Sequence, residues 1–261
     1  MPSLKLYGEM EGLNKYRERY SGRVSKAVKV LQREGFLPFL VRFVHYLKRL
    51  GFRTVTPIMK SALKNKSFCY QGQKLKYLAH RHNISWATER AVEVPIVLHH
   101  LRQQLKQLKT GNILEVGAVL RHYYPMLPGV VLDKFETGAG IVNEDVINYK
   151  PSKKYDLIIS ISTLEHVGFD DDLKDPLGTL KAVKNLKENC LAKNGSMFIT
   201  MPLGYNKDVD LLIFNNQFGF ANETYLKKTR FFNRWQEVRK DQAKVNYSFD
   251  HARAIVVGII K

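Results

Sequence analysis

The stretch that decides the fold is "GNILEVGAVLRHYYPMLPGVVLDKFE", residues 111–136. "NILEVG" is a short apolar run that ends at Gly117, as a buried strand before a tight turn does. "GVVLDKF" is a second apolar run, and it ends at Asp133. A carboxylate accepts two hydrogen bonds at once, so Asp133 suits the two ribose hydroxyls of a nucleoside. A dinucleotide would need further glycines beside its pyrophosphate, but Ala118, Val119 and Leu120 follow Gly117. The stretch therefore predicts a nucleoside site without a phosphate.

Apolar runs after this stretch extend the same pattern. "YDLIISIS" (155–162), "GSMFITMP" (195–202) and "ARAIVVGIIK" (252–261) predict strands, and Asn194–Gly195 predicts a turn before the second of them. "GTLKAVKNLKENCLAK" (178–193) predicts a helix. Strands that alternate with helices indicate an α/β fold, with a mostly parallel sheet and helices on both faces. In such sheets ligands bind beyond the carboxyl ends of the strands, where the strand order reverses.

Positive charge is concentrated near the N-terminus. The formal net charge is +18, and residues 1–66 hold 15 Lys and Arg against 4 Glu. We therefore divide the chain into a basic helical N-terminal region, 1–66, and a core domain, 67–261, with its motifs in 112–261. A basic segment of this kind favours an anionic partner, such as a membrane surface, a nucleic acid or a phosphate-bearing substrate.

Within the basic region, "LPFLVRFVHYLKRLGF" (37–52) has apolar residues three and four positions apart, which predicts an amphipathic helix. Pro38 stands in its first turn and Gly51 after its expected last turn. Two interpretations remain open. The helix either packs on the core, or lies in a bilayer interface with its cations near lipid phosphates.

Cysteine content and hydropathy indicate the compartment. Cys69 and Cys190 are far apart and match no zinc or redox spacing, so we interpret them as free thiols in a reducing compartment. The N-terminus is polar and charged, and no apolar run reaches the roughly 20 residues of a membrane span. We expect a cytoplasmic protein, with the basic region as a means of peripheral attachment to a membrane.

The ordered series "ILEVGAV", "VVLDKFE", "NEDVINY", "KYDLIISISTLEHVG" and "LAKNGSMFITMPLG" resembles the motifs of class I S-adenosylmethionine-dependent methyltransferases, over residues 112–261. The resemblance implies a Rossmann-like, seven-stranded, mostly parallel sheet. It also implies S-adenosyl-L-methionine as cofactor and S-adenosyl-L-homocysteine as product. Val119 and Arg121 stand where most members have glycine. The cofactor-binding residues that the resemblance implies are Glu115, Gly117 and Ala118 near the methionine part, Asp133 and Lys134 near the ribose, Asp145 and Val146 near the adenine, and Ser162.

A second segment, "NISWATERAVEVP" (83–95), is similar to methyltransferases of surface-glycan and other carbohydrate biosynthesis. The similarity implies substrate-binding roles for Trp86, Arg90, Glu93 and Tyr205. Glu89 and Glu93 lie about one helical turn apart, so we expect them to share a face while Arg90 points elsewhere. The alternative is a salt-bridged helix with Trp86 packed in the core.

The implied reaction is O-methylation of a sugar hydroxyl on a glycan or lipid-linked acceptor. It needs in-line positioning and a base for the hydroxyl proton. "STLEHVG" offers His166 as the first candidate base and Glu165 as the second, because an imidazole titrates near neutral pH. The alternative is that both residues cap the next helix and hold the loop.

Acidic residues follow in "FDDDLKDP", with Asp170, Asp171, Asp172 and Asp175. Such a cluster suits a divalent metal or sugar hydroxyls. We favour a solvated acidic loop and assign no metal ligand. Asp250 and His251 are further residues that could reach the site from the last loop.

The rival hypothesis is an RNA-directed methyltransferase that uses the basic region to bind phosphates. Enzymes of this fold that methylate base amino groups commonly carry Asn or Asp, two prolines and an aromatic residue after the strand at 155–162. This chain has "SISTLEH" there, which argues against amino-group methylation but leaves ribose or ring-carbon targets open. A non-catalytic, membrane-bound scaffold is a third interpretation.

Overall fold

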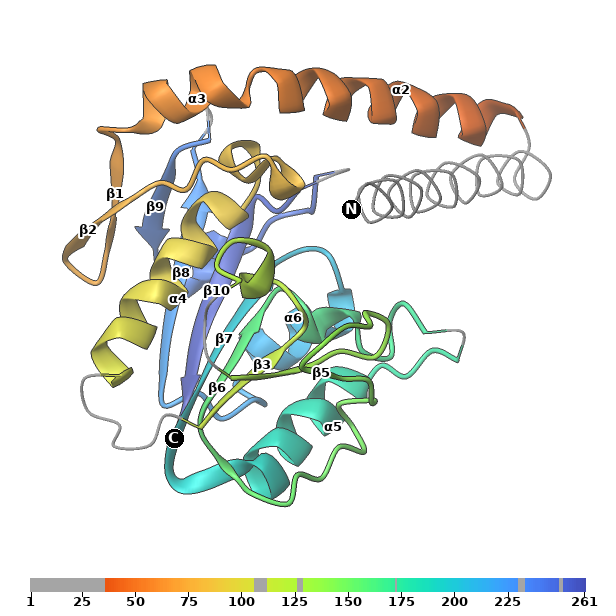
Figure 1. The fold of residues 1–261 in the computed structure, drawn as a ribbon, viewed down its shortest axis with the longest axis vertical. Helices are drawn as coiled ribbons and strands as arrows, with labels where there is room; N and C mark the ends of the chain where they lie inside the picture. Colours follow the sequence, from red (N-terminus) through yellow and green to blue (C-terminus); the bar gives the residue numbers. More distant parts are fainter. Residues whose placement is uncertain (1–35, 106–111, 126–128, 172, 230–232, 249–250) are drawn as a thin grey trace, which may run out of the picture. The chain divides into compact units, whose positions relative to one another are not determined.

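A computed structural model describes residues 36–105, 112–125, 129–171, 173–229, 233–248 and 251–261 (Figure 1). The chain divides into two compact units, one that ends at Val55 and one that spans Thr56–Lys261. Residues 1–35 of the predicted basic region lie outside the described residues, as do Asp172 and Asp250.

The first unit contains the helix α2, Phe36–Thr54, where the amphipathic pattern predicts a helix. Its Phe39 and Phe43 rings stack with centroids 6.2 Å apart. The predicted stop at Gly51 is wrong, because helical bonding continues through it. The Val55 N–H and the Thr54 hydroxyl donate to the Gly51 carbonyl oxygen at 3.4 and 2.7 Å. No helix of the described part is long and apolar enough to cross a membrane.

The second unit is built on an eight-stranded sheet with the order β5-β4-β3-β6-β7-β10-β8-β9. Pairs from β5 to β7 are parallel, and β10, β8 and β9 join them antiparallel. The strands are β3 (Ile113–Val116), β4 (Val130–Leu132), β5 (Ile141–Val142), β6 (Tyr155–Ile161), β7 (Leu191–Pro202), β8 (Asn222–Lys228), β9 (Trp235–Val238) and β10 (Ala254–Ile260).

The α/β fold and all five predicted strands are confirmed, but the sheet has eight strands rather than seven. The extra strand is β9, which pairs antiparallel with β8 at the sheet edge. The predicted turn at Asn194–Gly195 is also wrong. Both residues lie inside β7, where the pairing with β6 shifts register between Tyr155 and Leu157. A bulge of this kind accommodates extra residues without ending the strand.

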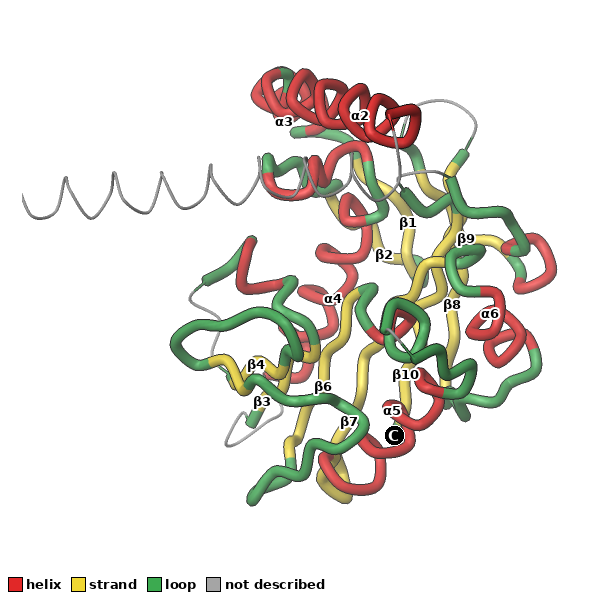
Figure 2. The backbone as a smooth tube through the Cα atoms, turned by 90° about the vertical axis from the view of Figure 1, so that its right-hand side faces the viewer, coloured by secondary structure: helices red, strands yellow, loops and turns green. Residues whose placement is uncertain are grey.

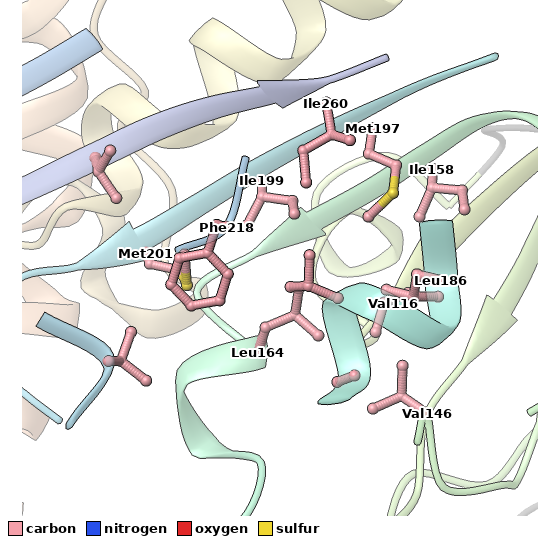
Figure 3. Close-up of a cluster of buried hydrophobic side chains, with 14 of the residues drawn as sticks. Val116, Val146, Ile158, Leu164, Leu186, Met197, Ile199, Met201, Phe218 and Ile260 are labelled. Atoms are coloured by element: carbon pink, nitrogen blue, oxygen red, sulfur yellow. The ribbon is translucent and has the colours of Figure 1, made fainter. Parts of the chain in front are cut away.

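Helices cover both faces of the sheet (Figures 1 and 2). The helix α4, Arg90–Leu105, packs on one face, and α5 (Gly178–Asn185), the π-helical turn η4 (Leu186–Cys190) and α6 (Lys207–Phe214) pack on the other. Side chains of a strand alternate between faces, so in β6 Leu157 and Ile159 join the α4 cluster while Ile158 joins the other. Figure 3 shows the larger cluster, which includes Leu186 and Met197.

The remaining elements are short. A hairpin of β1 (Ser67–Tyr70) and β2 (Gln73–Lys76) packs its Phe68 and Tyr70 in a cluster with Trp235 and Ile255. The Tyr70 hydroxyl lies 2.8 Å from His100 Nε2, which gives both buried polar groups a partner. The others are α3 (Thr56–Leu63) and the 3₁₀ turns η1 (His82–Ala87), η2 (Leu120–His122), η3 (Leu164–His166) and η5 (Lys240–Ala243).

Candidate active site

The strand order reverses between β3 and β6, and the loops that follow these two strands touch. From β3 the chain adds β4 and β5 on one side, and then β6 and β7 on the other. Gly117 ends β3 with φ +83°, and a Cβ there would lie 2.2 Å from Thr163 Oγ1, on the loop after β6. Only glycine allows both this backbone conformation and this approach. At the reversal point, the loop after β3 therefore packs directly against the loop after β6, with Gly117 in contact with Thr163.

Asp133 follows β4 and holds the neighbouring loops through backbone N–H groups. Its Oδ2 accepts from the Ala118 N–H at 3.1 Å. Its Oδ1 accepts from the Phe135 and Glu136 N–H groups at 2.9 and 2.8 Å. A carboxylate offers about four acceptor positions, so one remains, on Oδ2. The carboxylate is fixed in orientation beside the Gly117 turn, with room for one more donor rather than for the two ribose hydroxyls expected from the sequence.

Lys134 connects three loops at the same edge of the sheet. Its Nζ lies 2.9 Å from Asp145 Oδ2 and 2.9 Å from Asp171 Oδ1. The hydrogen bond with Lys134 lowers the pKa of Asp171, and the two carboxylates raise the pKa of Lys134. Val146, beside Asp145, is buried in the large core cluster. Of the two residues expected near the adenine, only Asp145 presents a partly exposed side chain.

Glu115 supports the Gly117 loop from beneath. Its carboxylate is buried on the α4 side of the sheet and accepts a hydrogen bond from the Leu120 N–H. The adjacent pocket is lined by apolar side chains such as Leu101 and Ile159. Burial raises the pKa of Glu115 to about 7, although the hydrogen bond from Leu120 opposes the shift. Glu115 therefore stabilises the loop after β3 by accepting a hydrogen bond from the loop's backbone.

Arg90 and Glu93 form a buried ion pair at the start of α4. Arg90 Nη1 donates to Glu93 Oε2, and Glu93 Oε1 accepts from Ser162 Oγ at 2.5 Å and Thr200 Oγ1 at 2.8 Å. The prediction that Arg90 points elsewhere is wrong. Residues at i and i+3 share a helix face, and a buried guanidinium requires a carboxylate partner. The pair fixes Ser162, whose φ of +39° is unusual for a residue with a side chain.

His166 lies on the turn η3 within a polar group at the end of β6. Its Nδ1 is 2.5 Å from Asp170 Oδ2. The Tyr205 hydroxyl donates to Asp170 Oδ2 at 2.9 Å and lies 3.1 Å from His166 Nδ1. The other ring nitrogen, Nε2, lies 3.5 Å from Glu165 Oε1. The two candidate bases are therefore adjacent, and Asp170 orients the imidazole.

Three buried polar atoms have no hydrogen-bond partner among the described residues: Arg90 Nε, Ser160 Oγ and Glu165 Oε2. Glu165 is 1% exposed, and its burial raises its pKa well above the ordinary range. Native proteins pair nearly all buried polar groups, so each exception calls for an explanation by strain, a functional role, a bound ligand or ion, or an ordered water. These atoms lie on or beside the ends of β6 and α4, near the reversal point.

Sequence reasoning did not find all of these contacts. The pairing of His166 with Asp170 follows their i, i+4 spacing, a signal that the sequence does carry. The roles of Thr163 and Thr200 had no such signal, because each acts through a contact between distant segments. The Trp86 indole N–H donates to Thr56 Oγ1 at 3.1 Å, which supports a packing role for Trp86.

The acidic loop does not form a metal site in the described part of the chain. No group of three or more His, Cys, Asp or Glu side chains there could hold a metal ion. Asp171 pairs with Lys134, and Asp175 Oδ2 lies 2.6 Å from Lys181 Nζ. Each described acid in this loop therefore has a protein partner.

A scan against protein-family models gives no match, and neither does a search of curated protein sequences. Solved structures with a similar arrangement include methyltransferases, some of them in complexes with S-adenosylmethionine or S-adenosylhomocysteine. The N-methyltransferase NodS from Bradyrhizobium japonicum WM9 with S-adenosyl-l-homocysteine has 14% identity and a TM-score of 0.38, with 62% of this chain and 83% of that chain covered.

Two further structures are similar in the same way. An S-adenosylmethionine-dependent methyltransferase from Clostridium acetobutylicum ATCC 824 has 10% identity and a TM-score of 0.34, covering 61% of this chain and 88% of that chain. The DhpI–SAM–HEP complex has 15% identity and a TM-score of 0.31, covering 66% and 90%. These TM-scores lie below 0.5, so the likenesses add nothing to what the chain's own residues indicate.

Proposed function

We propose that the protein is an S-adenosylmethionine-dependent methyltransferase whose cofactor binds at the reversal point between β3 and β6. The observation that carries the proposal is the meeting there of the Gly117 turn and the Asp133 carboxylate. Open parallel sheets bind ligands beyond the carboxyl ends of their strands at such a point. The ordered motifs of residues 112–261 support the same conclusion.

The residues at this point fit an adenosine better than a dinucleotide. Asp133 keeps one acceptor position on Oδ2 for a ribose hydroxyl, and its orientation is already fixed. Val119 and Arg121 stand where further glycines would allow a pyrophosphate to approach backbone N–H groups. Bound S-adenosylmethionine would supply a methyl group activated by its sulfonium. The protein would have to orient the acceptor and hold its proton.

The acceptor that we propose is a sugar hydroxyl of a glycan or lipid-linked sugar. His166 would take the hydroxyl proton. Asp170 holds Nδ1, and a carboxylate partner on one ring nitrogen leaves the other as the basic one. Glu165, adjacent to Nε2, is the second candidate base. Tyr205 is the candidate acceptor contact, because its hydroxyl lies 3.1 Å from His166 Nδ1. Trp86 is a second candidate acceptor contact from the sequence, although its indole N–H is already used by Thr56. The Arg90–Glu93 pair holds Ser162 at the end of β6.

The test offers an oligosaccharide, a lipid-linked sugar and an RNA to the full chain with methyl-labelled cofactor. We expect label in the sugar. H166A should lower kcat about 100-fold without changing the affinity for S-adenosylhomocysteine. The matched control is H122A, at an exposed histidine that pairs with Glu136. Label in RNA alone would reject the glycan acceptor and favour the RNA-directed alternative.

The helix α2 supports attachment to an anionic membrane surface as a second part of the proposal. Its Leu40, Phe43, Val44 and Leu47 side chains are 41–55% exposed. Residues 36–54, which form α2, contain four Lys or Arg and no Asp or Glu. Exposed apolar side chains on a helix whose sequence also carries Lys and Arg suit a bilayer interface, whereas nucleic-acid binding would need only the charge.

A vesicle flotation assay tests this attachment. The full chain should float with vesicles that contain phosphatidylserine and much less with phosphatidylcholine alone. F43S/L47S should lose binding at unchanged net charge. A matched control is I58S, at an exposed apolar residue of α3. Equal flotation of F43S/L47S and the parent chain would reject the hypothesis that α2 attaches the protein to the membrane.

A further inference from the structure

Carboxyl groups outnumber cations around the start of α4 and the turn η3. Arg90 is paired with Glu93. Glu89 Oε2 accepts a hydrogen bond from the Ala252 N–H at 3.0 Å. Among the described residues, no lysine or arginine forms an ion pair with Glu89 or Glu165, and the nearest basic group to Glu165 is His166, whose Nε2 lies 3.5 Å from Oε1. Each acts electrostatically on the other, because both belong to the same group of charges around Arg90.

Aromatic rings lie close to these two carboxyl groups. Tyr205 packs on His166, the neighbour of Glu165, with ring centroids 4.8 Å apart, and burial together with the Glu89 and Glu165 charges raises the pKa of Tyr247. The Tyr205 ring centroid lies 5.2 Å from that of Tyr247 and 5.3 Å from that of Phe169. All three side chains are partly exposed. They form a partly exposed aromatic border beside the buried Glu165.

Two backbone features hold the rings in this position. A Cβ at Gly204 would lie 2.5 Å from the Tyr247 N, so only glycine lets the two loops meet. Asn206 Nδ2 donates to the Glu165 carbonyl oxygen at 2.9 Å, which fixes the Tyr205 loop against η3. The aromatic rings and the carboxyl groups are therefore parts of one arrangement.

Resting on the methyltransferase function proposed above, we propose that Glu89 and Glu165, with the rings of Tyr205 and Tyr247, form a subsite for a protonated amine of the acceptor. Aromatic faces attract cations, and a buried carboxyl group without a cationic partner is stabilised by one. Oε2 of Glu165, which has no described partner, is the atom that the ammonium would satisfy. The acceptor hydroxyl would then be held by its neighbouring amine.

The same arrangement disfavours other acceptors. A phosphate or carboxylate would be repelled by Glu89 and could not pair with Arg90, because Arg90 is already paired with Glu93. A neutral acetamido group in place of the amine would leave the carboxyl groups without a counter-charge. The inference therefore narrows the acceptor to an amine-bearing sugar.

Calorimetry on the full chain saturated with S-adenosylhomocysteine tests the inference. D-glucosamine is titrated at about pH 6.5, where its amine is protonated, and N-acetyl-D-glucosamine is the uncharged match. We expect glucosamine to bind at least about tenfold more tightly. E89Q and E165Q should each reduce this preference several-fold. E188Q, at an exposed acid of η4, should keep it.

Each contrary outcome has a distinct meaning. Equal binding of the two sugars, no binding of glucosamine, or an undiminished preference in both E89Q and E165Q would overturn the amine subsite. Weaker S-adenosylhomocysteine binding in both variants would also overturn it, because the carboxyl groups would then serve the amine of the cofactor. Failure of the parent chain to bind S-adenosylhomocysteine would instead reject the proposed function itself.

Discussion

Two carboxyl groups at the carboxyl ends of parallel strands, Asp133 after β4 and Glu165 after β6, differ in how the fold satisfies them. Asp133 is partly exposed and accepts three backbone hydrogen bonds. Glu165 is 1% exposed, and its Oε2 has no partner among the described residues. Both oxygens of Asp133 have partners and the carboxylate is oriented for one more donor from a ligand, whereas Glu165 needs a further group or a proton.

The difference follows from which atoms surround each side chain. A loop that turns back on itself supplies several backbone N–H groups at no cost in side-chain entropy. Glu165 is surrounded by side chains that already have partners, notably the Arg90–Glu93 pair. A carboxylate that accepts hydrogen bonds from backbone N–H groups depends mainly on its own loop. A carboxyl group surrounded by side chains depends on several segments that are distant in the sequence.

The largest effect should follow from removal of Glu93. Glu93→Ala leaves the Arg90 guanidinium buried without its hydrogen-bonded carboxylate, which typically costs about 3–5 kcal/mol of unfolding free energy. Urea denaturation measures the loss. Glu188→Ala, at an exposed acid, should change stability by less than about 0.5 kcal/mol. A loss for Glu93→Ala as small as that would mean that the cluster does not depend on the ion pair.

Substitution of Glu115 should change how the free energy of unfolding depends on pH. Its pKa is raised from 4.5 to about 7, so the folded state holds this proton more tightly than the unfolded state. Stability from this group is full below about pH 4.5 and is lost as pH rises to about 7. The loss amounts to about 2–3 kcal/mol, and Glu115→Gln should remove this slope from denaturation curves at pH 5 and pH 8.

The matched control for Glu115→Gln is Glu237→Gln, a substitution in the exposed part of β9. Glu237→Gln should leave the dependence of the unfolding free energy on pH the same as in the parent chain. Identical slopes in the parent chain and Glu115→Gln would show that the Glu115 carboxyl ionises in its ordinary range despite burial.

A smaller effect is expected on cofactor binding at Asp133. Asp133→Ala removes one charge-assisted hydrogen bond to the ribose and loosens the loop, so affinity for S-adenosylhomocysteine should fall by about 2 kcal/mol, roughly 30-fold. Isothermal titration calorimetry measures it. Glu136→Gln, three residues on and 50% exposed, should have no effect. An undiminished affinity of Asp133→Ala for S-adenosylhomocysteine would contradict the proposed position of the cofactor.

The smallest effect should come from Lys134, whose ion pairs are partly exposed. Lys134→Met should weaken S-adenosylhomocysteine binding by less than about 1 kcal/mol, because exposed ion pairs contribute little. The difference from the parent chain should shrink between low and high salt, since salt screens these charges. Lys153→Met is the control. A salt-independent loss would indicate a direct contact between Lys134 and the cofactor.

The sequence by itself determined five strands of the sheet, because nearly continuous apolar runs such as 155–162 are typical of strands buried in a parallel sheet between helices. It also determined the position of Asp133, since the end of an apolar run is a local feature. The edge strands β5, β8 and β9 were not predicted. β5 has only two residues, and β8, with the sequence NETYLKK, has too few apolar side chains for a clear pattern.

Only the tertiary structure decided which partners the charged residues have. Arg90 pairs with Glu93 because both are buried where α4 meets Ser162 and Thr200, residues that lie 69 and 107 positions from Glu93. The unpaired Oε2 of Glu165 likewise results from the packing of several segments around it. Hydrogen bonding and burial of charge depend on neighbours in space, and sequence periodicity reports only which face of an element is apolar.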